Sequence, residues 1–501
     1  MKNRETIMKI SNFDNVAVAL EPIEKGRIIS LGSEEIESLD DIAFGHKIAL
    51  ADIKENEDII KYGSPIGHAT RDIKKGEHVH THNLKTNLSG IINYSYDPDL
   101  ELISRFEQEK QEAYFDGYLR PDGNAGTRNE IWIIPTVGCV NNTAKILAEK
   151  AGAMYKDEID GVFAYTHNMG CSQLGDDHRT TQKILSGLVK HPNAGGVLVL
   201  SLGCENNNLE DFRKVLGDVD ESRVKFLVTQ DVEDEYEAAM NLIKELAEKM
   251  SSEKRQKISA EKLVLGFKCG GSDAFSGITA NALCGRVNDM LVKHGGSTLL
   301  TEVPEMFGAE TILMKRAVSP EVFEKTVNLI NNYKNYFTKY NQTIYENPSP
   351  GNKQGGISSL EEKSLGCTQK GGLAPVTGVL DYGESVQAKG LNLLTGSGND
   401  QVSCTNLVAS GAQMILFTTG RGNPFGSPVP TVKISSNTDL YDKKRNWIDF
   451  NAGQLLEGKS FEELTPEFFG YILDVASGKI KTKNESYGYR EISIFRDGVI
   501  L

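Results

Sequence analysis

Three histidines alternate along a short segment of the chain. The segment 77–83 reads Glu-His-Val-His-Thr-His-Asn. In an extended strand His78, His80 and His82 would share one face, with successive side chains about 6.5 Å apart. Imidazole is the commonest metal ligand, and carboxylates complete sites for ions such as iron(II) or manganese(II). The segment therefore predicts either a divalent-metal site or a polar strand edge without a metal.

A further histidine lies beside a lysine. Gly45, His46 and Lys47 form a short turn before the apolar segment 48–50. An imidazole and an ammonium group presented together suit proton transfer and the binding of an anion. By itself, however, the pair is weak evidence for either role.

Polar, glycine-rich segments follow seven short apolar runs. Ligands of open α/β sheets bind beyond the carboxyl ends of the strands, where amides, hydroxyls and carboxylates suit a polyhydroxylated ligand. Each segment alone could be an ordinary turn, but the seven together favour a ligand site. The segments are 136–142, 166–173, 202–207, 268–273, 301–305, 395–400 and 418–422.

Four of these segments carry a cysteine at nearly the same point, namely Cys139, Cys171, Cys204 and Cys269. Three such thiolates could hold an iron–sulfur cluster, although the chain has no Cys-x-x-Cys spacing. The alternative is that they are small, semi-buried residues beside a cleft. The seven cysteines of the chain, an odd number, do not predict a disulfide framework.

The elements that position these residues begin with a small β module over residues 1–95. Short apolar pieces and turn signals alternate there, and Asp52-Ile53-Lys54 and Asp72-Ile73-Lys74 form a weak repeat in register. The charged segment 96–117 predicts a linker that could include one helix.

The rest of the chain predicts a large α/β region with parallel sheets, because continuous apolar runs alternate with longer amphipathic stretches. A long charged helix within 233–262 divides it into domains 118–255 and 256–501. The predicted strands are 131–135, 161–165, 196–200, 224–228, 263–267, 297–300, 391–394 and 414–417.

Composition excludes several classes of protein. The net charge of -14 disfavours binding to nucleic acid or to an anionic membrane, so an anionic substrate needs a local basic site. The N-terminal segment 1–12 is polar, without the apolar stretch of a signal peptide, and no apolar run of about 18 residues occurs, so we expect a cytoplasmic protein. The sequence leaves a homo-oligomer open.

Nine longer motifs point to one family. The chain resembles the altronate/galactarate dehydratase family over essentially its whole length. The resemblance implies an SAF-type β module followed by an α/β region, dependence on iron(II) or another divalent ion, and a role in hexuronate catabolism. The alternating histidines favour the altronate branch. The motifs are 45–47, 60–67, 77–83, 126–130, 203–207, 269–273, 302–310, 347–353 and 419–422.

This resemblance implies removal of water from a sugar acid. A base takes the C2 proton, the C3 hydroxyl leaves with the help of an acid, and the enol becomes a 2-keto-3-deoxy acid. Deprotonation adds a second negative charge beside the carboxylate, and a divalent cation acting as a Lewis acid offsets it. We expect His46 or Lys47 as the base and His167 or His178 as the acid.

The remaining expected ligands fall into two sets. Arg128 and Arg421 are candidates for a bidentate pair with the substrate carboxylate. The β module and the strand ends each supply only some of the metal ligands, the acid, the base and the carboxylate ligands. We therefore expect the module to close over the α/β site. The other expected substrate ligands are Asn129, Asn142, Ser272, Asp273, Asn399 and Asp400, and the expected metal ligands are His80, His82 and Glu305.

Three alternatives to this function are considered from the sequence. A nicotinamide-dependent oxidoreductase would need a Gly-x-Gly-x-x-Gly turn after the first α/β strand, and segment 136–142 has none. A sugar-acid-binding protein without catalysis would not need histidines, thiols and carboxylates at strand ends. A dehydratase for another sugar acid, such as galactarate, is the nearest alternative.

Overall fold

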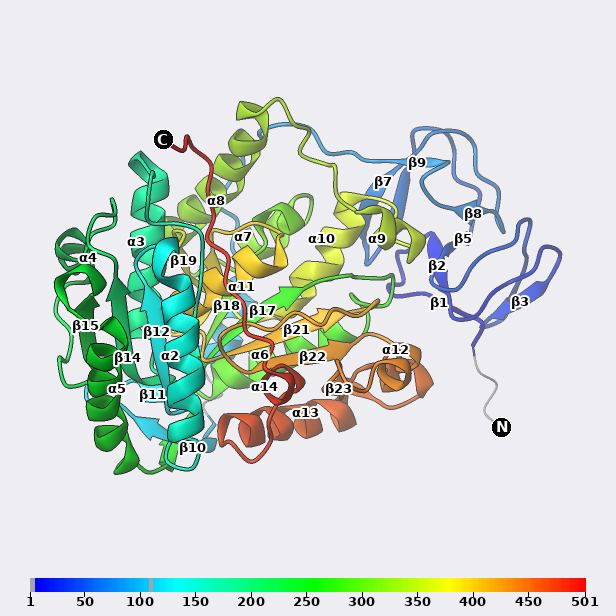
Figure 1. Ribbon diagram of the computed structural model, residues 1–501. Helices are drawn as coiled ribbons and strands as arrows, with labels where there is room; N and C mark the ends of the chain where they lie inside the picture. The colour runs from blue at the N-terminus through cyan, green and yellow to red at the C-terminus, as the bar shows by residue number, and fades with distance from the viewer. Residues whose placement is uncertain (1–4, 108–110) are drawn as a thin grey trace.

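The computed structural model describes residues 5–107 and 111–501. Figure 1 shows a β module at one end of the molecule, an α/β unit with the longest parallel sheet in the middle, and a second α/β unit at the other end. The predicted fold class is confirmed. None of the helices in the described ranges is long and apolar enough to span a membrane.

The module is built from short antiparallel strands. The two copies of the repeat pair through Ile53 and Ile73, whose backbones exchange two hydrogen bonds of 2.8 Å. Its sheets are β1-β2-β5-β8, the hairpin β3-β4, and β6-β7-β9. The bounds are β1 (Ile7–Met8), β2 (Val16–Ala19), β3 (Ile28–Leu31), β4 (Glu34–Glu37), β5 (Lys47–Ala49), β6 (Asp58–Lys61), β7 (Ser64–Ala69), β8 (His78–Val79) and β9 (Leu84–Lys85).

The predicted linker, residues 96–117, contains one helix, α1 (Leu100–Glu107). Residues 108–110 of the linker lie outside the described residues. Strand β10 (Tyr114–Leu119) begins inside the predicted linker and pairs with β11 (Ala125–Gly126) and with β16 (Gln256–Ser259). These pairings join the start of the second α/β unit to the start of the C-terminal unit. The predicted domain limits at 95, 117 and 255 stay a prediction.

The second α/β unit holds four parallel strands in the order β13-β12-β14-β15. All six residues of β12 are buried, as expected for a parallel strand covered on both faces. Helices α2 and α5 cover one face of the sheet, and α3 and α4 cover the other. The elements are β12 (Glu130–Pro135), α2 (Asn141–Met154), β13 (Gly161–Ala164), α3 (Gly175–Lys190), β14 (Ala194–Ser201), α4 (Leu209–Leu216), β15 (Val224–Val228) and α5 (Glu235–Ser251).

The C-terminal unit is a seven-stranded parallel sheet in the order β19-β20-β18-β17-β21-β22-β23. Its strands are β17 (Val264–Cys269), β18 (Ser297–Leu300), β19 (Val376–Leu380), β20 (Gly390–Leu394), β21 (Met414–Thr419), β22 (Thr431–Ser435) and β23 (Phe450–Asn451). Its helices are α6 (Ala280–Lys293), α7 (Glu310–Met314), α8 (Pro320–Lys339), α9 (Pro350–Gln354), α10 (Leu360–Thr368), α11 (Asp400–Ala409), α12 (Thr438–Lys443), α13 (Phe461–Ala476) and α14 (Lys483–Tyr487).

All eight predicted α/β strands are present, with ends shifted by up to two residues. Sequence analysis missed β19, β22 and β23. Glycine interrupts the apolar run of β19, β22 contains a lysine, and β23 has only two residues, so none shows a continuous apolar run. The neighbouring strands supply the partners that make these segments strands.

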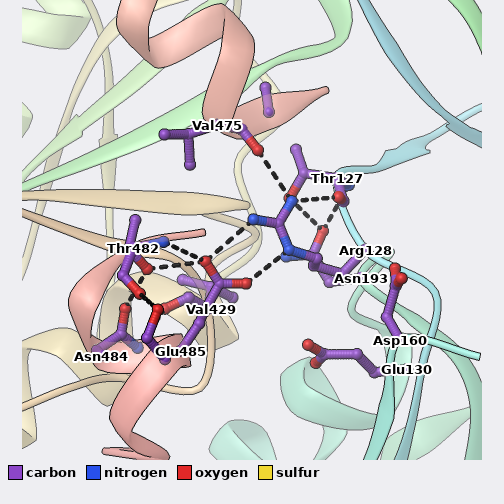
Figure 2. Close-up of polar contacts among 12 residues, drawn as sticks. Thr127, Arg128, Glu130, Asp160, Asn193, Val429, Val475, Thr482, Asn484 and Glu485 are labelled. Carbon is purple, nitrogen blue, oxygen red and sulfur yellow. Dashed lines mark hydrogen bonds and ion pairs between the residues drawn. The ribbon is translucent and has the colours of Figure 1, made fainter. Parts of the chain in front are cut away.

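A buried ion pair joins the two α/β units, as Figure 2 shows. Arg128 donates to Glu485 of α14 from Nε at 2.6 Å and from Nη2 at 3.0 Å, and both side chains are almost fully buried. The Nη1 group donates to the carbonyls of Thr127 and Val475. Burial opposes ionisation of Glu485, yet Arg128 and Arg490 lower its pKa to about 2. Arg128 thus lies in a structural contact.

Candidate active site

Four histidines of the module form one group, which we call the histidine group: His46, His78, His80 and His82. Strand β5 pairs with β8 so that Ile48 lies opposite His78, which brings the turn at His46 toward His80. His46 Nδ1 lies 3.0 Å from His78 Nε2. The ring of His80 lies 4.7 Å from that of His46, and the ring of His82 lies 5.2 Å from that of His78, between centroids.

Three of these imidazoles, those of His46, His78 and His80, are held in the neutral form. Burial lowers the pKa of His78 to about 4 and that of His80 to about 3, and it also lowers the pKa of His46. Near pH 7 each of these three rings therefore keeps one unprotonated nitrogen that can accept a proton or bind a metal ion. Two of them reach the C-terminal unit: His80 Nδ1 lies 2.8 Å from Ser358 Oγ, and His46 Nε2 lies 3.3 Å from the Gln354 carbonyl.

A buried lysine pair fixes the module to the C-terminal unit. Lys47 Nζ donates to Glu362 at 2.9 Å, to Ser358 Oγ at 2.7 Å and to the Gly356 carbonyl at 2.9 Å, and Lys61 Nζ donates to Glu362 at 2.7 Å. Burial lowers the pKa of Lys47 to about 8, while the two lysines outweigh burial and lower that of Glu362 to about 2. Lys47 and Lys61 carry two positive charges, whereas Glu362 carries one negative charge. A net positive charge therefore remains beneath the histidine group.

The strand ends of the C-terminal sheet carry a second group. Cys269 ends β17, Glu305 follows β18, and Cys367 belongs to α10. The two Sγ atoms lie 3.3 Å apart, and Glu305 Oε2 lies 3.1 Å from Cys269 Sγ and 2.9 Å from Cys367 Sγ. All three side chains are buried, and these atoms are close enough to hold a metal ion.

Lysines surround this second group. Lys363 pairs with Glu305 at 2.9 Å. Lys268 and Lys370 both pair with Glu302, Lys370 at 2.7 Å, and Lys268 also contacts Asp400 at 3.1 Å. The hydrogen bond with Cys269 and burial raise the pKa of the Cys367 thiol well above its usual range. In this structure the Cys367 thiol therefore keeps its proton and donates to the Glu305 carboxylate.

Arg421 and Asp273 lie at the interface where the module meets the C-terminal unit around Gln354 and Ser358, which we call the seam. Arg421 is exposed and donates to Gln354 Oε1 at 3.0 Å, while the carbonyl of the same glutamine faces His46. Asp273 is buried and accepts from Ser436 Oγ at 2.8 Å, and burial raises its pKa despite these bonds. The neighbouring Ser272 carbonyl accepts from Asn352.

The structure thus brings one part of the expected set together. The gathered residues are His46, Lys47, His80, His82, Ser272, Asp273 and Arg421, with Glu305 and Asp400 in the adjoining buried network. Asn399 instead caps α11, where its side chain accepts from the Val402 N–H. Among the described residues, the group within 4.8 Å that contains Glu305 includes two thiols and neither His80 nor His82.

The other expected residues belong to the second α/β unit, which lies at the opposite end of the molecule from the module (Figure 1). His167 is buried and its Nε2 lies 2.8 Å from the Pro135 carbonyl. His178 lies on α3 and Asn142 in the first turn of α2. Asn129 accepts from Arg120. A single chain therefore does not bring these residues, or Arg128, to the seam.

Sequence analysis missed the helix that connects the two groups. All nine residues of α10 are buried, and it carries Glu362 toward the module and Lys363 and Cys367 toward the C-terminal strand ends. Its sequence, Leu-Glu-Glu-Lys-Ser-Leu-Gly-Cys-Thr, has the charge of a surface helix. The one available signal was Lys61, which stands within the family motif 60–67.

Imidazoles, lysines and an exposed arginine lie between a small β module and the strand ends of a parallel α/β unit, which suits a lyase that acts on an anionic substrate. The chain belongs to the altronate/galactarate dehydratase family. It matches the altronate/galactarate dehydratase SAF domain over residues 5–87. It also matches the D-galactarate dehydratase/altronate hydrolase second domain over 117–251 and the D-galactarate/altronate dehydratase C-terminal domain over 260–500.

Individual relatives agree with this assignment. The chain is 54% identical to the altronate dehydratase of Bacillus subtilis strain 168, with 99% of this chain and 100% of the relative covered. It is 48% identical to the altronate dehydratase of Escherichia coli K12, with 99% of each covered. It is 33% identical to the galactarate dehydratase (L-threo-forming) of the same organism, with 97% of this chain and 96% of the relative covered.

Proposed function

We propose that the chain is an altronate dehydratase, a hydro-lyase that converts D-altronate to 2-keto-3-deoxy-D-gluconate in hexuronate catabolism. Two altronate dehydratases match it at 54% and 48% identity over their full lengths, against 33% for the galactarate enzyme. In the structure, the observation that carries the proposal is the histidine group held over the strand ends, with the exposed Arg421 beside it.

His46 is the base in this proposal. It is half-buried at the seam, its pKa is lowered by burial, and it is separated from Arg421 only by Gln354. Lys47, the other candidate, is fully buried and donates to three acceptors, so it has no direction left in which to meet a substrate. Lys47 is a positioning residue, because its Nζ and His80 Nδ1 both contact the Ser358 hydroxyl.

His46 alone can accept and return the proton that the reaction transfers. His46 takes the C2 proton and returns it to the C3 oxygen, which leaves as water, and the enol then becomes the 2-keto acid. This assignment replaces the expected acids His167 and His178, which the chain holds elsewhere. Arg421 binds the substrate carboxylate in a charge-assisted pair, and the excess positive charge of Lys47 and Lys61 adds attraction for the anion.

The chemistry of the histidine group fits the divalent ion that the family resemblance implies, although no three of its rings bring nitrogen atoms within 4.8 Å of one another in this structure. His78 and His80 are neutral, and the group lies at an accessible seam around the paired strands β5 and β8, whereas the Cys269–Glu305–Cys367 group is closed on all sides. We propose His80 and His82 as ligands of iron(II) or manganese(II), together with His78. When bound, the ion would act as a Lewis acid toward the substrate carboxylate.

The test is turnover by protein purified without oxygen. We expect a chelator to abolish formation of the 2-keto-3-deoxy acid and iron(II) or manganese(II) to restore it. Altronate should be consumed faster than galactarate or mannonate under the same conditions. Full activity in a preparation shown to be free of metal would overturn the metal assignment, and a preference for galactarate would overturn the substrate.

A further inference from the structure

The three exposed cysteines of the chain all belong to the second α/β unit, far from the seam. All seven cysteines are free, and Cys269, Cys284, Cys367 and Cys404 are buried. The exposed ones, Cys139, Cys171 and Cys204, all belong to the second α/β unit. Cysteine is among the most buried residue types and an exposed thiol is prone to oxidation, so three exposed thiols in one unit require an explanation.

The sheet places the three thiols at one edge. They follow β12, β13 and β14, which are adjacent and parallel, so the carboxyl ends of these strands meet. Pro135 pairs with Leu200, and each is followed four residues later by a cysteine, Cys139 and Cys204. Cys171 comes from the strand on the other side of β12.

Hydrogen bonds join the residues that flank the cysteines. The Gly138 N–H donates to the Met169 carbonyl at 3.0 Å, and the Asn207 N–H donates to the Gly170 carbonyl at 2.9 Å. Asn207 Nδ2 donates to the Thr136 carbonyl at 3.0 Å. The three loops therefore form one connected surface, with a cysteine on each.

Buried hydrogen bonds and a close backbone approach hold the same loops in place. The Glu205 carboxylate accepts from Thr136 Oγ1 at 2.5 Å, from Ser201 Oγ at 2.7 Å and from the Gly203 N–H at 2.6 Å. Gly170 has φ of 99°, and a Cβ there would fall 2.1 Å from the Thr136 carbonyl oxygen, so only glycine permits this approach. Such preorganisation is typical of binding sites.

A buried polar atom in these loops also lacks a partner. Asn207 is fully buried, its N–H and Nδ2 connect the loops of Cys171 and Cys139, and its Oδ1 has no hydrogen-bond partner. An unpaired buried oxygen costs free energy, and it is usually explained by a bound water, ion or ligand. This observation is independent of the thiols.

We propose that Cys139, Cys171 and Cys204 bind a 4Fe–4S cluster and leave one iron without a protein ligand. A single ion does not suit them, because no group within 4.8 Å among the described residues contains these thiols. A cluster suits them better, because it binds each thiolate to a different iron atom. A disulfide would use only two of the three thiols and would leave the third unexplained. The open iron offers a position for an oxygen ligand such as a hydroxy acid.

The cluster can be measured without substrate, in full-length protein purified or reconstituted without oxygen. We expect about four irons and four acid-labile sulfides per chain, a broad visible charge-transfer absorption, and an electron paramagnetic resonance signal after reduction. Cys139→Ser, Cys171→Ser and Cys204→Ser should each lose most of the sulfide and the absorption. Cys404→Ser, which removes a buried thiol elsewhere, should keep both.

Circular dichroism checks that each variant is folded. Iron without sulfide in the wild type would overturn the proposal, and so would unchanged sulfide and absorption in a folded variant that lacks all three cysteines. Because iron and sulfide are counted without turnover, failure of this proposal leaves the altronate assignment untouched. An inactive enzyme that retains its cluster would instead argue against the proposed function.

Discussion

Two neighbouring residues of the module have different environments. His46 is half-buried at the seam, while Lys47 is fully buried against Glu362 and Ser358. A base must reach the substrate, whereas a buried ammonium group with three acceptors is held in place. Catalysis and positioning are therefore separated over two consecutive positions.

Replacing His46 tests this separation. We expect His46→Ala to lower kcat by about 10²-fold to 10⁴-fold, the usual contribution of a general base, and to leave the fold intact. The matched control is His68→Ala, because His68 lies in the same module but bonds to Asn87 outside the histidine group. Steady-state kinetics with altronate measures the effect. Near-normal turnover by His46→Ala would place the base on another residue.

At the scale of elements, helix α10 carries charged side chains although all nine of its residues are buried. Ser359 caps its N-terminus by accepting from the Glu362 N–H, and the Glu362 side chain receives both Lys47 and Lys61. Buried charges of this kind are tolerated only when paired. The helix thus ties the module to the C-terminal sheet.

Removing the shared carboxylate should loosen this contact. We expect Glu362→Gln to lower the free energy of unfolding by about 3–5 kcal/mol, because two buried ammonium groups lose their counter-charge. Glu467→Gln, which breaks a surface pair with Lys459, should change it by about 0.5 kcal/mol or less. Urea denaturation compares the two. Equal stability of both variants would contradict a structural role for Glu362.

The Arg128–Glu485 pair makes a pH-dependent contribution. The pKa of Glu485 falls from 4.5 to about 2 on folding, so its contribution of about 3 kcal/mol is present above about pH 4.5 and is lost as the pH falls toward 2. In Arg128→Met most of this loss should disappear from acid titrations followed by denaturation. KM for altronate should stay unchanged. A raised KM with normal stability would restore Arg128 as a substrate ligand.

At the scale of the whole molecule, the proposed chemistry needs two regions. The module supplies the histidine group and the C-terminal unit supplies Arg421 and Glu362. The connection between them contains the half-exposed helix α1. A tether of this kind keeps the module at a high effective concentration near its docking surface.

Separated fragments test the need for both regions. We expect residues 1–100 and 101–501 to be inactive alone and to regain turnover when mixed, since base and carboxylate ligand then meet again. A 101–501 fragment that carries Glu362→Gln should recover less activity at the same module concentration. Full activity of fragment 101–501 alone would show that the module is not required.

Local patterns predicted much of this fold. Apolar runs predicted eight parallel strands, because a strand buried on both faces must be apolar throughout. The repeat at Ile53 and Ile73 predicted the module. The three alternating histidines lie together as expected, but the extended strand predicted for them ends at Val79, and His80 and His82 lie in the turn that follows. The family motifs indicated the class of reaction. Each of these signals depends on residues that are close in sequence.

Tertiary structure decided which of these residues meet. Lys47 and Glu362 are separated by 315 positions, and Cys269 and Cys367 by 98. In sequence, Glu362 and Lys363 are indistinguishable from surface charges, and Arg128 is indistinguishable from Arg421. The difference arises only when strand order and crossovers bury one partner against another, because the cost of burying a charge forces it to pair with whatever the fold brings near.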